Sequence, residues 1–286
     1  MTNAIELKNL RKSYPGFTLE NISLTLPAGQ IMGFLGENGA GKTTAIKAML
    51  GLIRRDGGQI RLLGKDVDQD GAAVKKAVGV VLDDCPFPIL LSAAEVERIL
   101  SRIYDNWDSR VFAARCRSLG LDPQKPVKEY SKGMRTKLSL AAALAHHARL
   151  LILDEPTSGL DPVVREELLD LLREFIQDES HSILFSSHIT SDLDKIADRV
   201  AFLHEGRLLL CREKDEMLDD MGILRCPERE LALLPQGQVE RIRRGAFGCE
   251  ALIRDRRGLA RRRPGLVIDP AHLEDIMLFY IKGERL

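Results

Sequence analysis

The first thirty residues of the chain alternate between apolar and polar positions. Ile5 and Leu7 stand between polar neighbours, and a similar alternation recurs at Leu19, Ile22, Leu24 and Leu26. This period is typical of half-buried strands, so we expect an edge sheet in this part of the chain. The apolar run 31–35 follows a Pro-Ala-Gly turn and predicts a buried strand.

Beyond this region, short apolar runs alternate with segments of helical spacing. We predict further strands around Gly206 and at 59–63, 78–82, 150–153 and 182–185. Helices are predicted from Ala45 onward and at 137–148, 163–176 and 189–197. Residues 92–122 also carry apolar side chains at helical spacing, and Pro123 and Pro126 close the segment. We interpret about 86–130 as a helical insertion.

From about residue 214 the pattern weakens. Nine arginines lie between 241 and 263, against the two acidic residues Glu250 and Asp255. This cluster could contact phosphate or a membrane surface, but the solvated face of a small appendage accounts for it better. Pro270 then predicts the start of a final helix.

Composition narrows the class of protein. The 286 residues suffice for a substantial core, and 42 Lys and Arg against 42 Asp and Glu give no support for a nucleic-acid partner. The five cysteines contain no C-x-x-C pair, which favours reduced thiols over a metal site or disulfides. The N-terminus lacks a signal-peptide core, and no apolar run approaches the ~18 residues that span a bilayer. A membrane role would therefore require another chain.

A glycine-rich stretch follows the buried run 31–35 and precedes a predicted helix. It matches Gly-x-x-x-x-Gly-Lys-Thr and comprises Gly36, Glu37, Asn38, Gly39, Ala40, Gly41, Lys42, Thr43 and Thr44. Glycines let backbone N–H groups turn toward a phosphate chain, and the helix N-terminus adds partial positive charge. Lys42 can then reach the β- and γ-phosphates, while the Thr43 hydroxyl can bind Mg²⁺. A chance glycine-rich turn is the weaker alternative.

Two carboxylates, Asp154 and Glu155, end the apolar run 150–153. Asp154 could hold Mg²⁺ through the metal's waters, and Glu155 could act as general base toward an in-line water. An isolated Asp-Glu usually only marks where a strand exits to water, but the phosphate loop upstream favours the functional interpretation. Asp83 follows the run 78–82, where it could meet Mg²⁺ or merely mark the strand end.

Four further residues are candidates on weaker grounds. Tyr14 lies beside a Pro-Gly turn and could stack on a purine ring or stand as a surface tyrosine. Ser131 and Gly133 precede the helix 137–148, where they could bind an anion, although most serines there only cap a helix. A lone histidine is more often structural, but His188 follows the strand 182–185, at the edge where open parallel sheets bind ligands.

Together these motifs resemble the nucleotide-binding subunit of an ATP-binding cassette (ABC) transporter over roughly residues 3–215. The stretch GENGAGKTT matches the family's Walker A loop, LLILDEP its Walker B strand and SGLD its D-loop. YSKGM stands at the place of the LSGGQ signature, and His188 at that of the switch histidine. YSKGM and the terminal LEDIMLFYIKGE particularly resemble bacterial export-type cassettes whose permease is a separate chain.

The resemblance implies a P-loop α/β fold with a mostly parallel core sheet and an antiparallel edge sheet. The ATPase domain would occupy 1–215, with a helical subdomain at about 86–130 and a small α+β appendage at 216–286. It also implies ATP hydrolysis with Mg²⁺. Tyr14 would stack on adenine, Gly36 to Thr44 would hold the phosphates, and Thr43, Asp83 and Asp154 would serve the metal. Glu155 would be the general base, and His188 would contact the γ-phosphate. Ser131 and Gly133 would act on ATP bound to a second cassette, in a homo- or heterodimer.

Three positions depart from the family pattern. Asp83 replaces the Q-loop glutamine, Lys132 a signature glycine and Met134 the signature glutamine. Aspartate can still bind Mg²⁺ or its water, although its shorter, charged side chain alters the coupling geometry. Met134 lacks the polar contacts of glutamine, whereas Lys132 adds positive charge near the partner's phosphates.

The expected function is ATP-driven closure and opening of a cassette dimer that moves a transmembrane permease. The chain would then lie peripherally at the cytoplasmic face of the cell membrane, bound through the permease and without nucleic acid. A soluble cassette ATPase that acts on nucleic acid or ribosomes is the alternative, and only the arginine-rich segment favours it. A non-hydrolysing ATP-binding regulator is a third hypothesis, which the presence of Glu155 and His188 disfavours.

Overall fold

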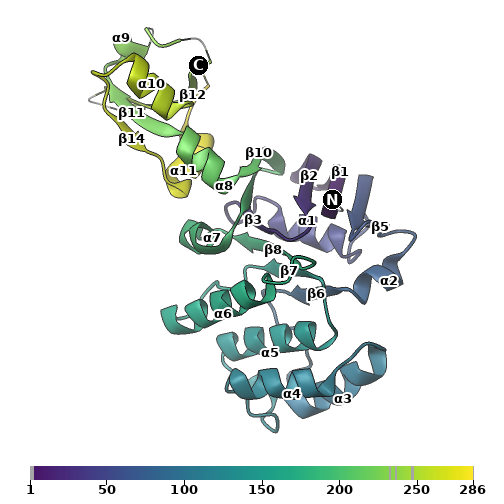
Figure 1. The fold of residues 1–286 in the computed structure, drawn as a ribbon. Helices are drawn as coiled ribbons and strands as arrows, with labels where there is room; N and C mark the ends of the chain where they lie inside the picture. The colour runs from purple at the N-terminus through teal and green to yellow at the C-terminus, as the bar shows by residue number, and fades with distance from the viewer. Residues whose placement is uncertain (1–2, 232, 236, 246–247, 286) are drawn as a thin grey trace.

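The computed structural model describes residues 3–231, 233–235, 237–245 and 248–285. A central α/β body carries a helical region at one end and a smaller region of strands and helices at the other (Figure 1). The predicted α/β class, with a parallel core and an antiparallel edge sheet, is confirmed.

The central sheet has six strands in the order β10-β9-β3-β8-β7-β6. Their bounds are β3 Ile31–Leu35, β6 Val78–Val81, β7 Leu150–Asp154, β8 Ser182–Ser187, β9 Arg199–His204 and β10 Arg207–Glu213. From β9 to β6 in this order, each strand pairs with the next in parallel. Strand β10 is antiparallel to β9. Because parallel strands end at one edge of a sheet, the loops after β3, β6, β7 and β8 meet there.

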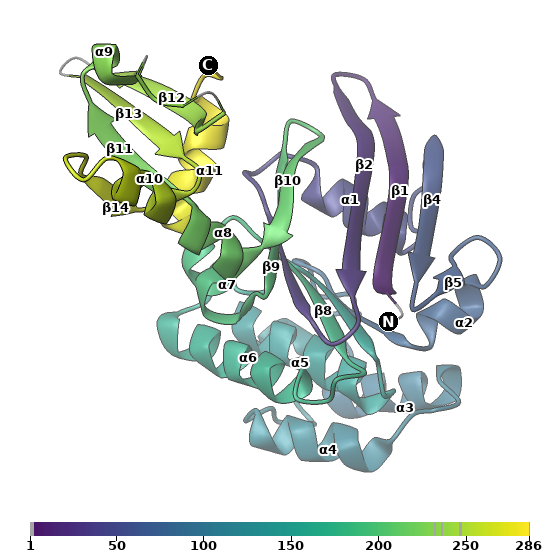
Figure 2. The same ribbon diagram turned by 45° about the horizontal axis from the view of Figure 1, so that its top comes forward.

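A second, antiparallel sheet lies beside the first, as Figure 2 shows. Its order is β2-β1-β4-β5, with β1 Asn3–Tyr14, β2 Phe17–Pro27, β4 Gly57–Leu62 and β5 Lys65–Asp66. Helix α1 (Lys42–Met49) lies between the two sheets, where Ala45 and Ile46 share one apolar cluster with Ile5 and Phe34. The short helix α2 (Gly71–Lys75) leads into β6. Burial from both sides thus holds α1 and the loop before it in place.

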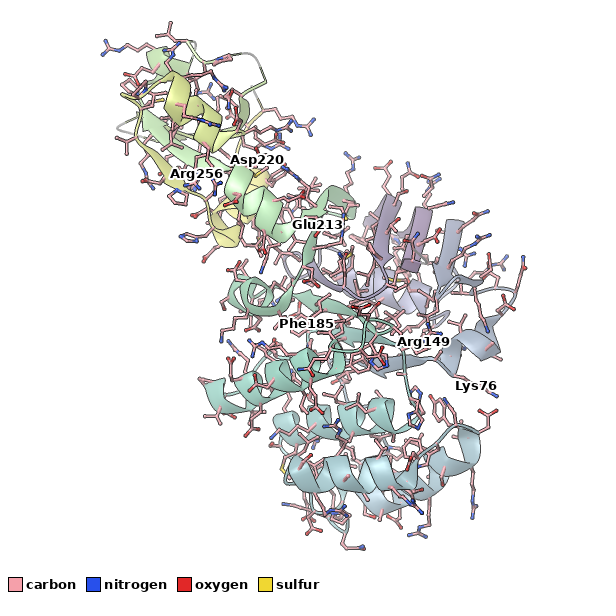
Figure 3. All side chains as sticks on the ribbon, in the orientation of Figure 1. Lys76, Arg149, Phe185, Glu213, Asp220 and Arg256 are labelled. Atoms are coloured by element: carbon pink, nitrogen blue, oxygen red, sulfur yellow. The ribbon has the colours of Figure 1, made fainter. Side chains whose placement is uncertain are left out.

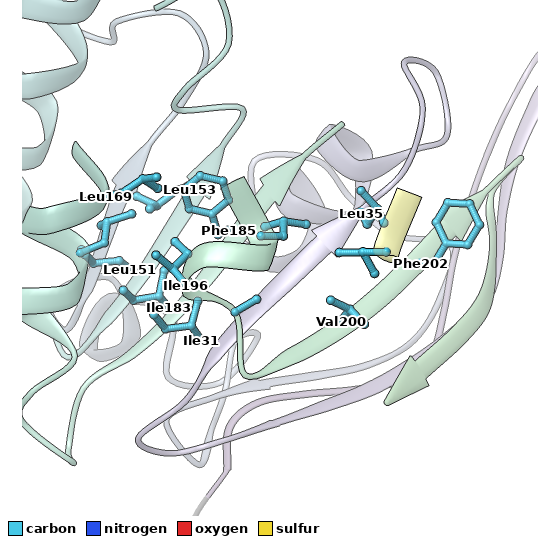
Figure 4. Close-up of a cluster of buried hydrophobic side chains, with 14 of the residues drawn as sticks. Ile31, Leu35, Leu151, Leu153, Leu169, Ile183, Phe185, Ile196, Val200 and Phe202 are labelled. Atoms are coloured by element: carbon cyan, nitrogen blue, oxygen red, sulfur yellow. The ribbon is translucent and has the colours of Figure 1, made fainter. Parts of the chain in front are cut away.

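The opposite face of the central sheet is covered by helices. These are α5 Lys132–Ala145, α6 Pro162–Phe175 and α7 Thr190–Ile196. Figure 4 shows the cluster that they bury, in which Leu169 and Ile196 pack on Leu151, Ile183 and other strand residues. The view in Figure 3 places Phe185 in this interior and Lys76 and Arg149 nearer the helical region.

The helical region follows β6 and has its own apolar cluster. It contains α3 Ala93–Ile103, α4 Ser109–Ser118 and the 3-10 turn η1 Val127–Glu129, and it packs on α5. Our prediction of a helix at 137–148 was wrong at both ends. Helix α5 begins earlier because Ser131 caps it, accepting a hydrogen bond from the Met134 N–H. It ends earlier because His147 adopts a left-handed backbone with φ 54°.

The C-terminal region forms a third sheet, in the order β12-β13-β11-β14. Its strands are β11 Gly222–Cys226, β12 Val239–Gly245, β13 Gly248–Ile253 and β14 Ile268–Pro270. Its helices are α8 Lys214–Asp220, α9 Glu228–Leu231, α10 Arg256–Arg262 and α11 Leu273–Lys282. In Figure 3, the labels Asp220 and Arg256 mark this region. Helix α11 turns back to the central sheet, where Ile276 and Phe279 join the main core.

Candidate functional site

The glycine-rich loop connects β3 to α1 and brings backbone close to the end of β9. A Cβ atom on Gly36 would lie 2.5 Å from the backbone oxygen of Leu203, so only glycine fits there. Gly41 stands at the N-cap of α1 with φ 106°, a left-handed conformation that favours glycine. The free N–H groups of the first turn of α1 therefore face the loop.

A cavity of about 280 Å³ opens beside this loop. It is lined by Phe17, Glu37, Asn38, Gly39, Gly41, Lys42, Thr43, Thr44, Asp83 and Glu155. These residues come from the β1–β2 hairpin, the loop, the start of α1 and the ends of β6 and β7. Residues that are far apart in the sequence thus converge on one small polar space.

Lys42 lines the cavity, and only 5% of its side chain is exposed. Its ammonium group donates hydrogen bonds to the backbone oxygens of Gly36, at 2.6 Å, and Glu37, at 3.1 Å. Glu155 Oε1 lies 3.0 Å from Lys42 Nζ, in an ion pair without a directed hydrogen bond. An anion that enters the cavity could bind this buried cation by displacing Glu155 from it.

Glu155 is held by contacts on three sides. Its backbone has φ 49°, and its N–H donates to Ser186 Oγ at 3.1 Å. Its second carboxylate oxygen, Oε2, lies 2.7 Å from Nδ1 of His188. The structure therefore brings together Lys42, Glu155 and His188, three of the residues that we predicted for the site.

Asp154 is almost completely buried at the end of β7. The Ser186 hydroxyl donates to Asp154 Oδ1 at 2.7 Å, so this one serine contacts both predicted carboxylate residues. Asp154 and Ser186 face each other because β7 and β8 pair in parallel register. We did not single out Ser186 from the sequence. The signal that could have revealed it is that Ser186 directly follows the run 182–185, as Asp154 directly follows 150–153, so that parallel pairing of the two runs places them side by side.

The aromatic residue that lines the cavity is Phe17. Tyr14, which we predicted for adenine, lies outside the lining, with 44% of its surface exposed and with Lys12 Nζ 5.1 Å above its ring centre. The two aromatic residues are paired across the β1–β2 hairpin. The sequence marked this hairpin as aromatic but did not tell which ring faces the loop.

The remaining predicted residues divide between the cavity and its surroundings. Thr43, Thr44 and Asp83 line the cavity, whereas Ser131 and Gly133 lie at the start of α5 and outside it. Gly133 is buried against α6, where a Cβ atom would lie 2.8 Å from Val164 Cγ1. Ser131 is exposed.

Two further features of the molecule concern metals and membranes. In the described part of the chain, no three or more His, Cys, Asp or Glu side chains gather into a metal-binding group. Among the helices of residues 3–231, 233–235, 237–245 and 248–285, none has both the length and the apolar composition that crossing a bilayer requires.

Comparison with known proteins assigns the family. The model of the family described as ABC transporter matches residues 19–158. The lantibiotic transport ATP-binding protein SrtF of Streptococcus pyogenes is 33% identical over 213 residues, which are 74% of this chain and 91% of SrtF. The chain belongs to the ABC transporter family. It is an ATP-binding cassette and the ATPase subunit of a transporter.

Further relatives agree with this assignment. The bacitracin transport ATP-binding protein BcrA of Bacillus licheniformis is 34% identical over 212 residues, which are 73% of this cassette and 69% of BcrA. Among solved structures, the dimeric cassette MJ0796 in a post-hydrolysis state with ADP and phosphate superposes with a TM-score of 0.65 at 22% identity. The superposition covers 73% of this cassette and 98% of the MJ0796 chain, and at this identity it supports the fold alone.

Proposed function

We propose that this cassette hydrolyses MgATP with Glu155 as general base, and that it works as one of two cassettes that drive an export-type permease. The Lys42–Glu155–His188 arrangement inside the cavity of the glycine-rich loop is the observation that carries the proposal. Glu155 is present, held in place and next to the group that would bind phosphate.

The cavity suits the phosphate chain of a nucleotide. The first turn of α1 and the crowded glycines Gly36 and Gly41 offer backbone N–H groups at close range, and Lys42 adds a positive charge. Phe17 lines the same cavity, with Tyr14 paired beside it across the hairpin. This aromatic hairpin could contact the base of the nucleotide.

The oxygen donors around the cavity suit Mg²⁺. Thr43 and Asp83 line it, and Asp154 lies at the end of the strand that carries Glu155. Mg²⁺ prefers oxygen ligands and is usually held by one or two carboxylates together with substrate phosphates. Bound there, it would neutralise phosphate charge during hydrolysis. Ser186 orients the Asp154 carboxylate through its hydroxyl.

Glu155 is prepared for proton transfer by its two neighbours. Phosphates that engage Lys42 would compete with Glu155 for the ammonium group and leave the carboxylate free to accept a proton from water. His188 restrains the other carboxylate oxygen and so orients the base. Both contacts act on the same side chain, that of Glu155.

A second cassette would complete the site. Ser131 and Gly133 lie at the start of α5, outside the cavity of their own chain. A helix start with a serine and a glycine can bind an anion, so a second copy or a paralogue could present these residues to the phosphates held by Lys42.

A groove between α1 and the helical region is our candidate for the permease contact. It has a volume of about 560 Å³, and its apolar lining includes Met49, Leu52, Val74 and Tyr104. Leu52 is 56% exposed, and Ile103 at the end of α3 is 63% exposed. Exposed apolar side chains beside an apolar groove favour a protein partner.

The variant Glu155→Gln tests the proposal. We expect phosphate release to fall by at least about 100-fold, because the amide cannot accept the proton. The variant should form a dimer with ATP in sedimentation velocity and, when tagged, should recover a multi-spanning protein from solubilised membranes.

The exposed Glu179 serves as the control, since Glu179→Gln should hydrolyse ATP like the parent. Unchanged hydrolysis in Glu155→Gln would rule out Glu155 as the base. Recovery of ribosomes or nucleic acid in place of a membrane protein would favour the soluble ATPase instead.

A further inference from the structure

Two of the three departures from the family's motifs meet in space. The ammonium group of Lys132 donates to Asp83 Oδ1 at 2.7 Å, although the residues are 49 positions apart. Lys132 is the first residue of α5, and Asp83 follows β6. The ion pair therefore links the start of α5 to the edge of the central sheet.

The two members of this pair belong to different parts of the catalytic machinery. Asp83 lines the nucleotide cavity of its own chain, together with Lys42 and Thr43. Lys132 lies between Ser131 and Gly133, which we assign to nucleotide bound by the second cassette. Each charge thus lies at a place where a nucleotide or its metal would be bound under the proposed function.

The pair is arranged so that it can separate. The side chains are 44% and 56% exposed, and exposed ion pairs contribute little to stability. The neighbouring Arg135 cannot replace Lys132 without losing its bonds to the backbone oxygens of Val127 and Lys128. Lys132 is therefore the cation whose ion pair with Asp83 forms or breaks.

We propose that the ammonium group of Lys132 exchanges Asp83 for the phosphates of nucleotide bound to the second cassette. Asp83 is then free to serve Mg²⁺ in its own cavity, where a carboxylate is a preferred ligand. The ammonium group in turn gains a phosphate, a stronger charge-assisted partner than an exposed carboxylate. This inference rests on the proposed two-cassette ATPase.

The exchange couples the two nucleotide sites. Metal-bound nucleotide in one cavity draws Asp83 away from Lys132, and the released lysine completes the opposite site. Because binding linkage is reciprocal, occupancy of the opposite site equally favours release of Asp83. Nucleotide binding should therefore be cooperative, and the cooperativity should depend on both charges.

The test uses the full-length chain carrying Glu155→Gln, with dimer formation and binding of a fluorescent ATP analogue as readouts. Adding Lys132→Gln should weaken ATP-dependent dimer formation by about tenfold or more, because a contact to phosphate is lost. It should not weaken binding of the analogue to the monomer. Adding Asp83→Asn should instead raise the Mg²⁺ concentration needed for binding and reduce cooperativity.

The exposed pair Lys76–Asp105 provides the matched control, since Lys76→Gln breaks a similar pair away from both half-sites. Dimer formation by the Lys132→Gln chain equal to that of its parent would overturn the proposal. Identical effects of Lys132→Gln and Asp83→Asn on both readouts would also overturn it, because a purely structural link predicts that result. Failure of Glu155→Gln alone to dimerise would count against the two-cassette function instead.

Discussion

At the residue scale, the buried hydroxyl of Ser186 organises the carboxylates. It donates to Asp154 Oδ1 at 2.7 Å and accepts from the Glu155 N–H at 3.1 Å. Both bonds lie at the junction of β7 and β8, so one side chain holds the carboxylate of Asp154 and the backbone of Glu155. A residue with no reactive role of its own thereby determines the geometry of two that we assign to chemistry.

We expect Ser186→Ala to weaken Mg²⁺-dependent hydrolysis by about 10- to 100-fold, as for other groups that orient a metal ligand. Loss of a hydrogen bond to a buried carboxylate should also reduce the free energy of unfolding by about 1–3 kcal/mol. Phosphate release measured against Mg²⁺ concentration, together with urea denaturation, checks both effects.

Ser182→Ala is the matched control, because this buried serine lies at the other end of β8 and accepts from the Gly29 N–H. It should lose stability while keeping the Mg²⁺ dependence of the parent. The same Mg²⁺ dependence in both variants would limit Ser186 to a structural role.

At the element scale, the end of α5 joins the helical region to the central sheet. His146 caps this helix end, with only 4% of the residue exposed. Its ring stacks on Tyr104 with centres 4.4 Å apart, and its Nδ1 lies 3.3 Å from the backbone oxygen of Lys76. Burial lowers the pKa of His146 from its ordinary value of 6.5, so the folded state favours the neutral ring.

This lowered pKa predicts loss of stability in mild acid. A group whose pKa is lower in the folded state stabilises the fold above its unfolded pKa, and the contribution is lost as pH falls below about 6.5. The free energy of unfolding should then decrease by at most about 1.4 kcal/mol per pH unit from this group. Urea denaturation between pH 7 and pH 5 measures the slope.

Two variants at the helix end separate this effect from general acid sensitivity. His146→Phe keeps an aromatic ring against Tyr104 but cannot be protonated, so its pH slope should be flatter. His147→Asn changes the exposed neighbour to a residue that tolerates φ 54°, and it should keep the parent's slope. An unchanged slope in His146→Phe would contradict the assignment.

At the scale of the whole molecule, the C-terminal region is packed into the main core through α11. Phe279 is 1% exposed and belongs to the cluster of the central sheet, and Tyr280 meets Phe202 edge to face at 6.3 Å. The region also has a separate cluster, which contains Leu259. Residues 216–286 therefore share part of their core with the ATPase body.

We expect Phe279→Ala to destabilise the whole chain by about 3–5 kcal/mol, the usual range for a buried phenylalanine. The single tryptophan, Trp107, belongs to the helical region at the other end of the molecule (Figure 1). Its fluorescence during urea denaturation should show a lower unfolding midpoint in the variant.

Leu259→Ala, in the separate cluster, should move the Trp107 transition less. An unmoved transition in Phe279→Ala would mean that the C-terminal region unfolds independently of the ATPase body.

Short-range patterns in the sequence specify the local chemistry of this protein. The phosphate loop, the paired carboxylates after the run 150–153 and the order of strands and helices all depend on short spacings and on the periods of two and 3.6. Such patterns involve residues that are close together in the sequence, so they can be recognised without knowledge of the fold. They also carried the family resemblance, which the relatives confirm.

The contacts between residues far apart in the sequence follow from the fold. The pairing of β7 with β8 placed Ser186 against Asp154, the hairpin turned Phe17 to the cavity, and the start of α5 brought Lys132 to Asp83. Each contact depends on strand order, register or helix packing, which are set by burial across the whole core. The sequence therefore predicted a nucleotide site, whereas the fold revealed how its parts are held and linked.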